Sequence, residues 1–149
     1  MNTAAEIANY FLSLVDTEAG DSMSNLKLQK LVYYAQGFHL AITGKPLFED
    51  AIMAWEHGPV IPSLYHSFKQ HGAESIPPPE NGVDTAKYSV ETREILDEVF
   101  SVYGQFSAWK LRNMTHEEPP WKEVYSTDSP IRHETMRQYF STLLNEQAH

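Results

Sequence analysis

The sequence predicts a mainly α-helical protein, with about six helices packed around a central helix in a single compact domain. Three observations predict this class. Apolar residues recur at three- and four-residue spacing through most of the chain, Ser or Thr stands at the N-cap position of several such segments, and 149 residues are close to the length of one domain. A chain of this length buries a core without disulfides or a structural metal.

The first helix is predicted from a capping box. Thr3 and Glu6 have the required spacing, with Thr3 as the N-cap and Glu6 at the third helical position. Apolar residues follow at helical spacing, which extends the helix over residues 4–15. A polar loop that contains Gly20 separates it from the next helix.

The central helix is predicted over residues 25–43. Ser24 is its N-cap, and Gly44 ends it. Its apolar residues cover more than one stripe, which is typical of a helix contacted from several sides. We therefore expect Leu31 and Phe38, which lie two turns apart, to be buried in the core.

The segment after the central helix is predicted to be short and extended. An apolar run favours a small β-strand pair near residues 47–55, and Gly58-Pro59 is expected to form a turn. Pro62 suits the first turn of a helix over residues 61–71. The three prolines Pro77 to Pro79 cannot be helical, so we expect residues 76–88 to form a mobile surface loop within the single domain 1–149.

The remaining helices follow from caps and prolines. Ser89 and Ser107 each precede an apolar periodic segment, and Pro130 precedes the last one. The expected helices span residues 90–103, 108–115 and 131–146, with one helical turn over 121–125. On the first of these helices, Glu91, Glu94 and Glu98 share a face, which predicts a solvated acidic surface that faces a basic partner.

Composition excludes several classes of function. The formal net charge of −9 disfavours nucleic acid and anionic membrane surfaces as partners, because both need clustered cations. The absence of cysteine excludes thiol catalysis, Cys-ligated zinc and iron–sulfur clusters, and it fits a cytoplasmic location. No apolar run approaches the 20 or so residues of a membrane span, and the N-terminus has no basic segment of the kind that opens a signal peptide.

No enzyme motif is present. The sequence has no G-x-G pair, no P-loop and no G-x-S-x-G elbow. His116-Glu117-Glu118 resembles the start of a zinc-protease helix, but Pro119 stands where the second histidine is required. The adjacent carboxylates Glu117 and Glu118 are interpreted as solvated charge. We therefore expect no catalytic residue, no metal and no cofactor.

Two turn-rich stretches are the candidate site, because each combines a tryptophan, a histidine and proline. In one interpretation their tryptophans are core anchors and the polar side chains cap neighbouring backbone. In the other they shape a groove for a protein partner, where Trp and Tyr are enriched. Either way, large aromatic side chains need a shared apolar environment, so we expect the two stretches to pack side by side, with His57 or His116 hydrogen-bonded to backbone. The candidate residues are Trp55, His57, Gly58, Pro59, Tyr65, Thr115, His116, Glu117 and Trp121.

Several runs, in this order, resemble the SocA-like antitoxin family, which is defined by the Panacea domain and includes the phage-associated GepA-like proteins. The runs are Lys27-Leu28-Gln29-Lys30-Leu31-Val32-Tyr33-Tyr34-Ala35-Gln36-Gly37, Gly44-Lys45-Pro46-Leu47-Phe48-Glu49-Asp50, Ala54-Trp55-Glu56-His57-Gly58-Pro59-Val60-Ile61-Pro62, Leu64-Tyr65, Leu111, Thr115-His116-Glu117, Pro120-Trp121, Ile131 and Tyr139-Phe140. The doubled proline Pro119-Pro120 departs from the family pattern, which has a polar residue before the final Pro-Trp pair.

The resemblance implies a non-enzymatic antitoxin of a toxin–antitoxin or phage-associated locus. It would neutralise a toxin encoded nearby, either by masking it or by delivering it to a cellular AAA+ protease. Two alternatives stay open from the residues: a hydrolase that uses His57 or His116, and a transcriptional regulator. Metal analysis tests the first, and a salt-dependent DNA shift assay tests the second.

Overall fold

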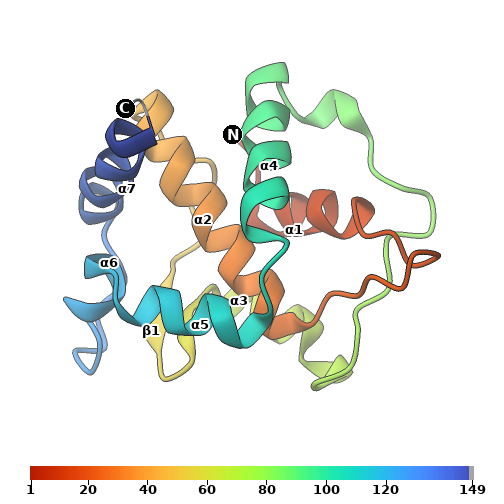
Figure 1. Ribbon diagram of the computed structural model, residues 1–149, viewed down its shortest axis with the longest axis horizontal. Helices are drawn as coiled ribbons and strands as arrows, with labels where there is room; N and C mark the ends of the chain where they lie inside the picture. The colour runs from red at the N-terminus through yellow and green to blue at the C-terminus, as the bar shows by residue number, and fades with distance from the viewer. Residues whose placement is uncertain (148–149) are drawn as a thin grey trace.

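Helix α2 (Asn25–Thr43) runs through the middle of the molecule, and the other elements pack around it (Figure 1). The structure, a computed structural model, describes residues 1–147, so the last two residues of the expected 1–149 domain lie outside it. Apart from Val60 and Trp121, the buried apolar side chains of this part form one continuous core. Besides α2, the helices are α1 (Ala4–Ser13), α3 (Pro62–Phe68), α4 (Val90–Tyr103), α5 (Ala108–His116), α6 (Pro119–Lys122) and α7 (His133–Gln147), with 3₁₀ turns at Lys69–His71 and Thr85–Lys87.

The bounds of α2 are those predicted from its caps. The Ser24 side chain accepts a hydrogen bond from the backbone N–H of Lys27, and Gly44 ends the helix in the left-handed conformation, with φ of 77°. Leu31 and Phe38 are both buried, as predicted. The helix is buried on several sides because α1, α4, α5 and α7 all contact it.

The helices α1 and α4 cover one side of α2. The predicted capping box of α1 is present, since Thr3 and Glu6 each bond the other's backbone N–H. The Tyr10 hydroxyl donates to the Asp97 carboxylate at 2.6 Å, which joins α1 to α4. Helix α1 ends at Ser13, earlier than the predicted residue 15, and α4 has the predicted bounds.

Helix α7 packs against α2, and its Phe140 ring lies against the backbone of α2 at Gly37. A Cβ atom at this position would overlap the ring of Phe140 on α7. The same ring contacts Tyr33, Tyr34 and Phe38 edge-on. The lack of a side chain at Gly37 therefore lets α7 seat an aromatic ring directly on the backbone of α2.

The strand pair is a hairpin of β1 (Met53–Trp55) and β2 (Gly58–Val60), antiparallel, with Trp55 opposite Gly58. The predicted small strand pair near residues 47–55 is confirmed. The predicted turn at Gly58-Pro59 was wrong, because the second strand occupies these residues and the turn falls at Glu56 and His57. Pro59 fits this strand because its backbone does not need an N–H to pair with β1. Its carbonyl accepts from Lys30 on the side away from β1, and its nitrogen faces the same side.

The remaining bounds shift by a few residues. Helix α3 is shorter than predicted and continues as a 3₁₀ turn. Helix α6 begins at Pro119, earlier than the predicted turn over 121–125, because the two prolines occupy its first turn, where a missing N–H has no cost. Helix α7 starts at His133, because the preceding Ile131 donates its backbone N–H to Ile52 next to β1, at 2.7 Å.

The segment 76–88 is attached at both ends. The backbone N–H of the buried Ile76 donates to the Met23 carbonyl at 2.7 Å, and the buried Tyr88 donates its hydroxyl to the Glu6 carbonyl at 2.6 Å. The side chains between them are exposed or half-buried. The mobility of this segment stays a prediction, and these anchors limit it to residues 77–87.

Candidate functional site: an aromatic corner

The β1–β2 hairpin meets α5 and α6 at one end of the molecule, at the lower left of Figure 1. The Trp121 indole N–H donates to the Trp55 carbonyl at 2.8 Å, and Arg112 Nε donates to His57 Nδ1 at 3.2 Å. The prediction that the two turn-rich stretches pack side by side is therefore confirmed. We call this region the aromatic corner and define it by Trp55, His57, Trp109, Trp121 and Tyr125.

Gly58 makes the close approach of the hairpin possible. Its φ of 108° lies in the region that favours glycine. A Cβ atom there would lie 2.6 Å from Cε of Lys30 on α2 and 2.8 Å from Oγ1 of Thr115 on α5. The hairpin therefore touches both helices through a position that has no room for a side chain.

Polar side chains of α2 bind the backbone that follows it. Buried Lys30 donates to the Pro59 carbonyl at 3.2 Å, and buried Gln29 accepts from the Ile61 N–H at 2.9 Å. Two turns further along, Gln36 accepts from the Leu47 N–H at 2.6 Å and donates to the Phe48 carbonyl at 2.8 Å. These side chains satisfy backbone groups that helix or strand pairing leaves open, which explains buried polar residues on a central helix.

Glu118 connects the corner to the core. Its carboxylate is buried between α2 and α7 and accepts from the Tyr33 hydroxyl at 3.1 Å and the Tyr34 hydroxyl at 2.8 Å, with a further hydrogen bond to Tyr139. The interpretation of Glu118 as solvated charge was wrong. It holds the turn between α5 and α6 against α2, and so fixes the position of Trp121 three residues later.

Burial shifts the pKa values of both charged residues beneath the corner. Desolvation raises the pKa of Glu118 to about 7, although the tyrosine hydrogen bonds act in the opposite direction. Desolvation, together with the nearby Arg112 charge, lowers the pKa of Lys30 to about 7. Each shift favours the neutral form, because an isolated charge is costly in a low-dielectric interior.

Glu118→Gln tests this burial through pH. Because the folded-state pKa of Glu118 lies above the unfolded value, its contribution to stability is complete below pH 4.5 and is lost as pH rises through 7. We expect the stability of wild type relative to Glu118→Gln to fall between pH 4.5 and 7, by on the order of 3 kcal/mol. Urea denaturation across this range measures it, and both proteins keep Lys30, so its titration cancels. A pH-independent difference would contradict the prediction.

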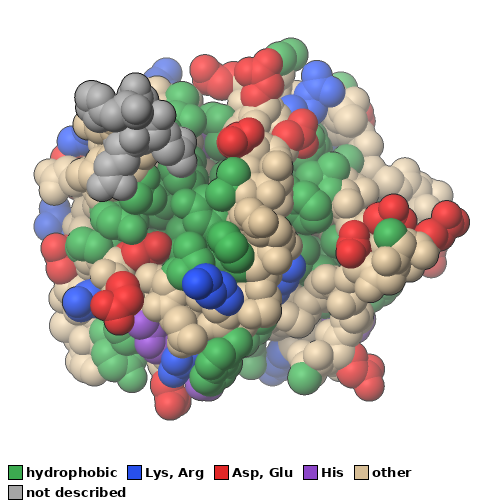
Figure 2. All heavy atoms as spheres, viewed as in Figure 1, with side chains coloured by type: hydrophobic (Ala, Val, Ile, Leu, Met, Phe, Trp, Pro, Cys, Tyr) green, Lys and Arg blue, Asp and Glu red, His purple; other side chains and the backbone are tan. Residues whose placement is uncertain are grey.

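The outer surface of the corner is aromatic. His116, Trp121 and Tyr125 form a stack with centroid separations of 4.0 and 4.3 Å. Trp109 is 55% exposed and carries the Arg112 guanidinium 4.4 Å from its ring centroid, while Trp55 and Tyr125 are 37% and 40% exposed. Figure 2 shows hydrophobic and histidine side chains along the lower edge of this face. Exposed aromatic rings held by stacking are typical of protein-binding surfaces.

The other predicted residues fall in or beside the corner. The Tyr65 ring packs edge-on against the Trp55 ring, with 5.3 Å between the ring centroids. The Glu117 side chain is exposed. His116 forms a hydrogen bond with the backbone of Glu56, as predicted for one of the two histidines, while its Nε2 is buried without a partner. Burial lowers the pKa of His116, so the stacked ring is favoured in its neutral form. Of the predicted acidic surface, Glu91, Glu94 and Glu98 are exposed on α4, away from the corner.

Sequence reasoning missed five residues of this region, namely Lys30, Trp109, Arg112, Glu118 and Tyr125. A lysine inside an otherwise buried helix was a signal for Lys30, and the spacing Trp109-x-x-Arg112 was a signal for the cation–π pair. Among the side chains that the structure describes, no group of three His, Asp or Glu residues is placed to hold a metal ion. The described helices include none long and apolar enough to cross a membrane.

The domain is mainly helical, with a buried polar network beneath an exposed aromatic corner. The chain belongs to the SocA-like antitoxin family, because the family model for the antitoxin SocA-like Panacea domain matches residues 28–122. A stretch of 54 residues is 44% identical to the antitoxin SocA of Caulobacter vibrioides (strain NA1000 / CB15N). It covers 36% of this chain and 29% of that relative, so the match spans less than a third of the relative's length. No solved structure matches the chain.

Proposed function

We propose that this protein is an antitoxin that neutralises a cognate toxin by direct protein contact in the cytoplasm, without catalysis. Its membership of the SocA-like antitoxin family supports this function. The observation that carries the binding part is the aromatic corner, where three large rings stay exposed although the chain has a well-filled core. Truncation of such exposed anchors is what most weakens protein interfaces.

The geometry of the two histidines supports binding over hydrolysis. His57 Nδ1 accepts a hydrogen bond from Arg112, and His116 is stacked on Trp121 with its Nε2 enclosed. In the part of the chain that the structure describes, neither ring bonds a serine or threonine hydroxyl or a carboxylate, which are the partners that nucleophilic catalysis requires. The net charge of −9 favours a protein partner over DNA.

The test uses the product of the reading frame adjacent to this gene as the candidate toxin. We expect this product to arrest growth when expressed alone and co-expression of wild type to restore growth. We expect Trp109→Ala to weaken binding of the purified product about 30-fold, because it removes the most exposed ring of the corner, with little change in melting temperature. Val90→Ala is the matched control, since Val90 is 62% exposed on α4.

Unchanged affinity for Trp109→Ala would place the toxin elsewhere on the molecule, and failure of wild type to bind or protect would refute the antitoxin function for this pair. His57→Ala and His116→Ala extend the test. If they melt like wild type yet fail to protect, the corner is a binding site, and if they unfold, its role is structural. The half-life of the bound toxin separates masking, which leaves it stable, from delivery to a AAA+ protease, which shortens it.

A further inference from the structure

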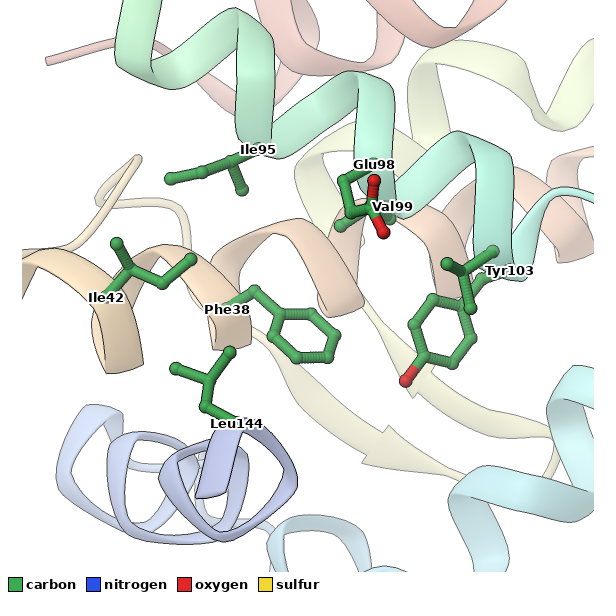
Figure 3. Close-up of a pocket in the computed structure, with 8 residues that line it drawn as sticks. Phe38, Ile42, Ile95, Glu98, Val99, Tyr103 and Leu144 are labelled. Atoms are coloured by element: carbon green, nitrogen blue, oxygen red, sulfur yellow. The ribbon is translucent and has the colours of Figure 1, made fainter. Parts of the chain in front are cut away.

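A second surface feature lies away from the corner, between α2, α4 and α7 (Figure 3). It is an apolar pocket whose walls include Phe38, Ile42, Ile95, Val99 and Leu144, with Glu98 at its rim. Its volume is about 70 Å³. That is about half of the roughly 150 Å³ that holds a benzene molecule, so the pocket has room for one aliphatic side chain. We call it the α4 pocket.

The α4 pocket is already formed and open. Phe38, Ile95 and Val99 are buried and packed in the core, so the floor is rigid. Ile42 at its edge is 47% exposed, an unusual state for an isoleucine on the central helix. Figure 2 shows hydrophobic side chains gathered in the hollow between α7 and α4, with acidic side chains beside them on α4. Covering such a surface removes apolar area from water.

The carboxylates next to the α4 pocket indicate the chemistry of the partner segment that would cover it. Glu91, Glu94 and Glu98 are three and four residues apart, so they follow one exposed face of α4 next to the pocket. Among the described residues, none of these three carboxylates pairs with a cation. From Glu91 to Glu98 the helix rises about 10 Å, so the acidic face is as long as two turns of a helix lying alongside it. The partner segment complementary to this surface is therefore apolar on one side and basic beside it.

We propose that the α4 pocket receives an aliphatic side chain from a basic segment of the toxin, and that lysine or arginine residues flanking this side chain pair with Glu98 and Glu94. The inference rests on the proposed antitoxin function and adds a second contact to the aromatic corner. The buried aliphatic anchor supplies affinity, while the carboxylates accelerate association and select the orientation of the segment. The contact is sensitive to salt because the carboxylates are exposed.

The experiment measures affinity and association rate of the purified product of the adjacent reading frame at 50 and 300 mM salt. Ile42→Glu places a charge at the mouth of the pocket, and Glu98→Lys reverses the charge at its rim. Both side chains are exposed, so the fold should tolerate the changes, and melting temperatures check this. The matched controls are Val90→Glu, an exposed apolar residue outside the pocket, and Glu80→Lys, an exposed carboxylate in the 76–88 segment.

We expect Ile42→Glu and Glu98→Lys each to weaken binding at least tenfold, with slower association for Glu98→Lys and a smaller dependence of its rate on salt. We expect Val90→Glu and Glu80→Lys to stay within threefold of wild type. Equal affinity of all four variants, with tight binding by wild type, overturns the α4 pocket as a contact and leaves the antitoxin function intact. Absence of binding by wild type refutes the antitoxin function for this pair and the pocket contact with it.

Discussion

Leu31→Ala is expected to destabilise the protein by about 2–5 kcal/mol. Leu31 is fully buried on α2, which packs against several other helices, and closely packed interiors relax only partly when atoms are removed. The loss has two parts, the transfer free energy of the removed atoms and the cavity that remains. It equals a large share of the 5–15 kcal/mol by which a typical domain is stable.

Urea denaturation at constant pH measures this change, and Ile42→Ala is the control. Ile42 is on the same helix but 47% exposed, so its truncation is expected to cost about 1 kcal/mol or less. A helix-propensity effect would be similar at both positions, whereas a packing effect is confined to Leu31. Equal losses in the two variants would contradict the role of Leu31 in the core.

Gly58→Ala is the second substitution with a large expected effect. A Cβ atom at Gly58 collides with Lys30 Cε and Thr115 Oγ1, and the positive φ adds backbone strain. Strain of this kind costs about 1–3 kcal/mol and overpacking about 1–3 kcal/mol, so the sum is about 2–6 kcal/mol. The hairpin must also move from α2 and α5, which disturbs the Lys30 hydrogen bond to Pro59 and the position of Trp55.

Gly44→Ala isolates the backbone contribution. Gly44 also has a positive φ, of 77°, but a Cβ atom there meets no heavy atom within 4 Å. Its replacement is expected to cost about 1 kcal/mol, and the excess in Gly58→Ala then measures the steric contact. If the aromatic corner binds the toxin as proposed, Gly58→Ala also weakens that binding through displaced aromatic rings. Equal melting temperatures for the two variants would show that the hairpin accommodates the methyl group at no cost.

The sequence predicted the helices best where a side chain caps them. Ser24 and Ser89 place the starts of α2 and α4 at the observed residues, because an N-cap hydrogen bond is a local interaction. The hairpin was harder to predict, since its second strand is three residues long and pairs on its outer edge with side chains of α2. No local pattern encodes that pairing, which depends on the tertiary position of Gln29 and Lys30.

The candidate site was predicted in part. Trp55 and Trp121 indicated that two distant stretches meet, because large aromatic rings seek common surroundings. The burial of Glu118 was missed, because glutamate is almost never fully buried unless it is paired. Its partners are the hydroxyls of tyrosines 84 and 85 residues earlier in the chain, a distance at which sequence spacing carries no information.

The seating of α7 on Gly37 has a consequence for how the molecule can be divided. The family match ends at residue 122, before α7, and begins at residue 28, after α1. Phe140 covers the rings of Tyr33, Tyr34 and Phe38, so a fragment limited to the matched residues would leave these rings in water. We therefore expect the matched segment not to fold on its own, because its central helix also packs against α1 and α7, and we expect the described chain to unfold as one cooperative unit.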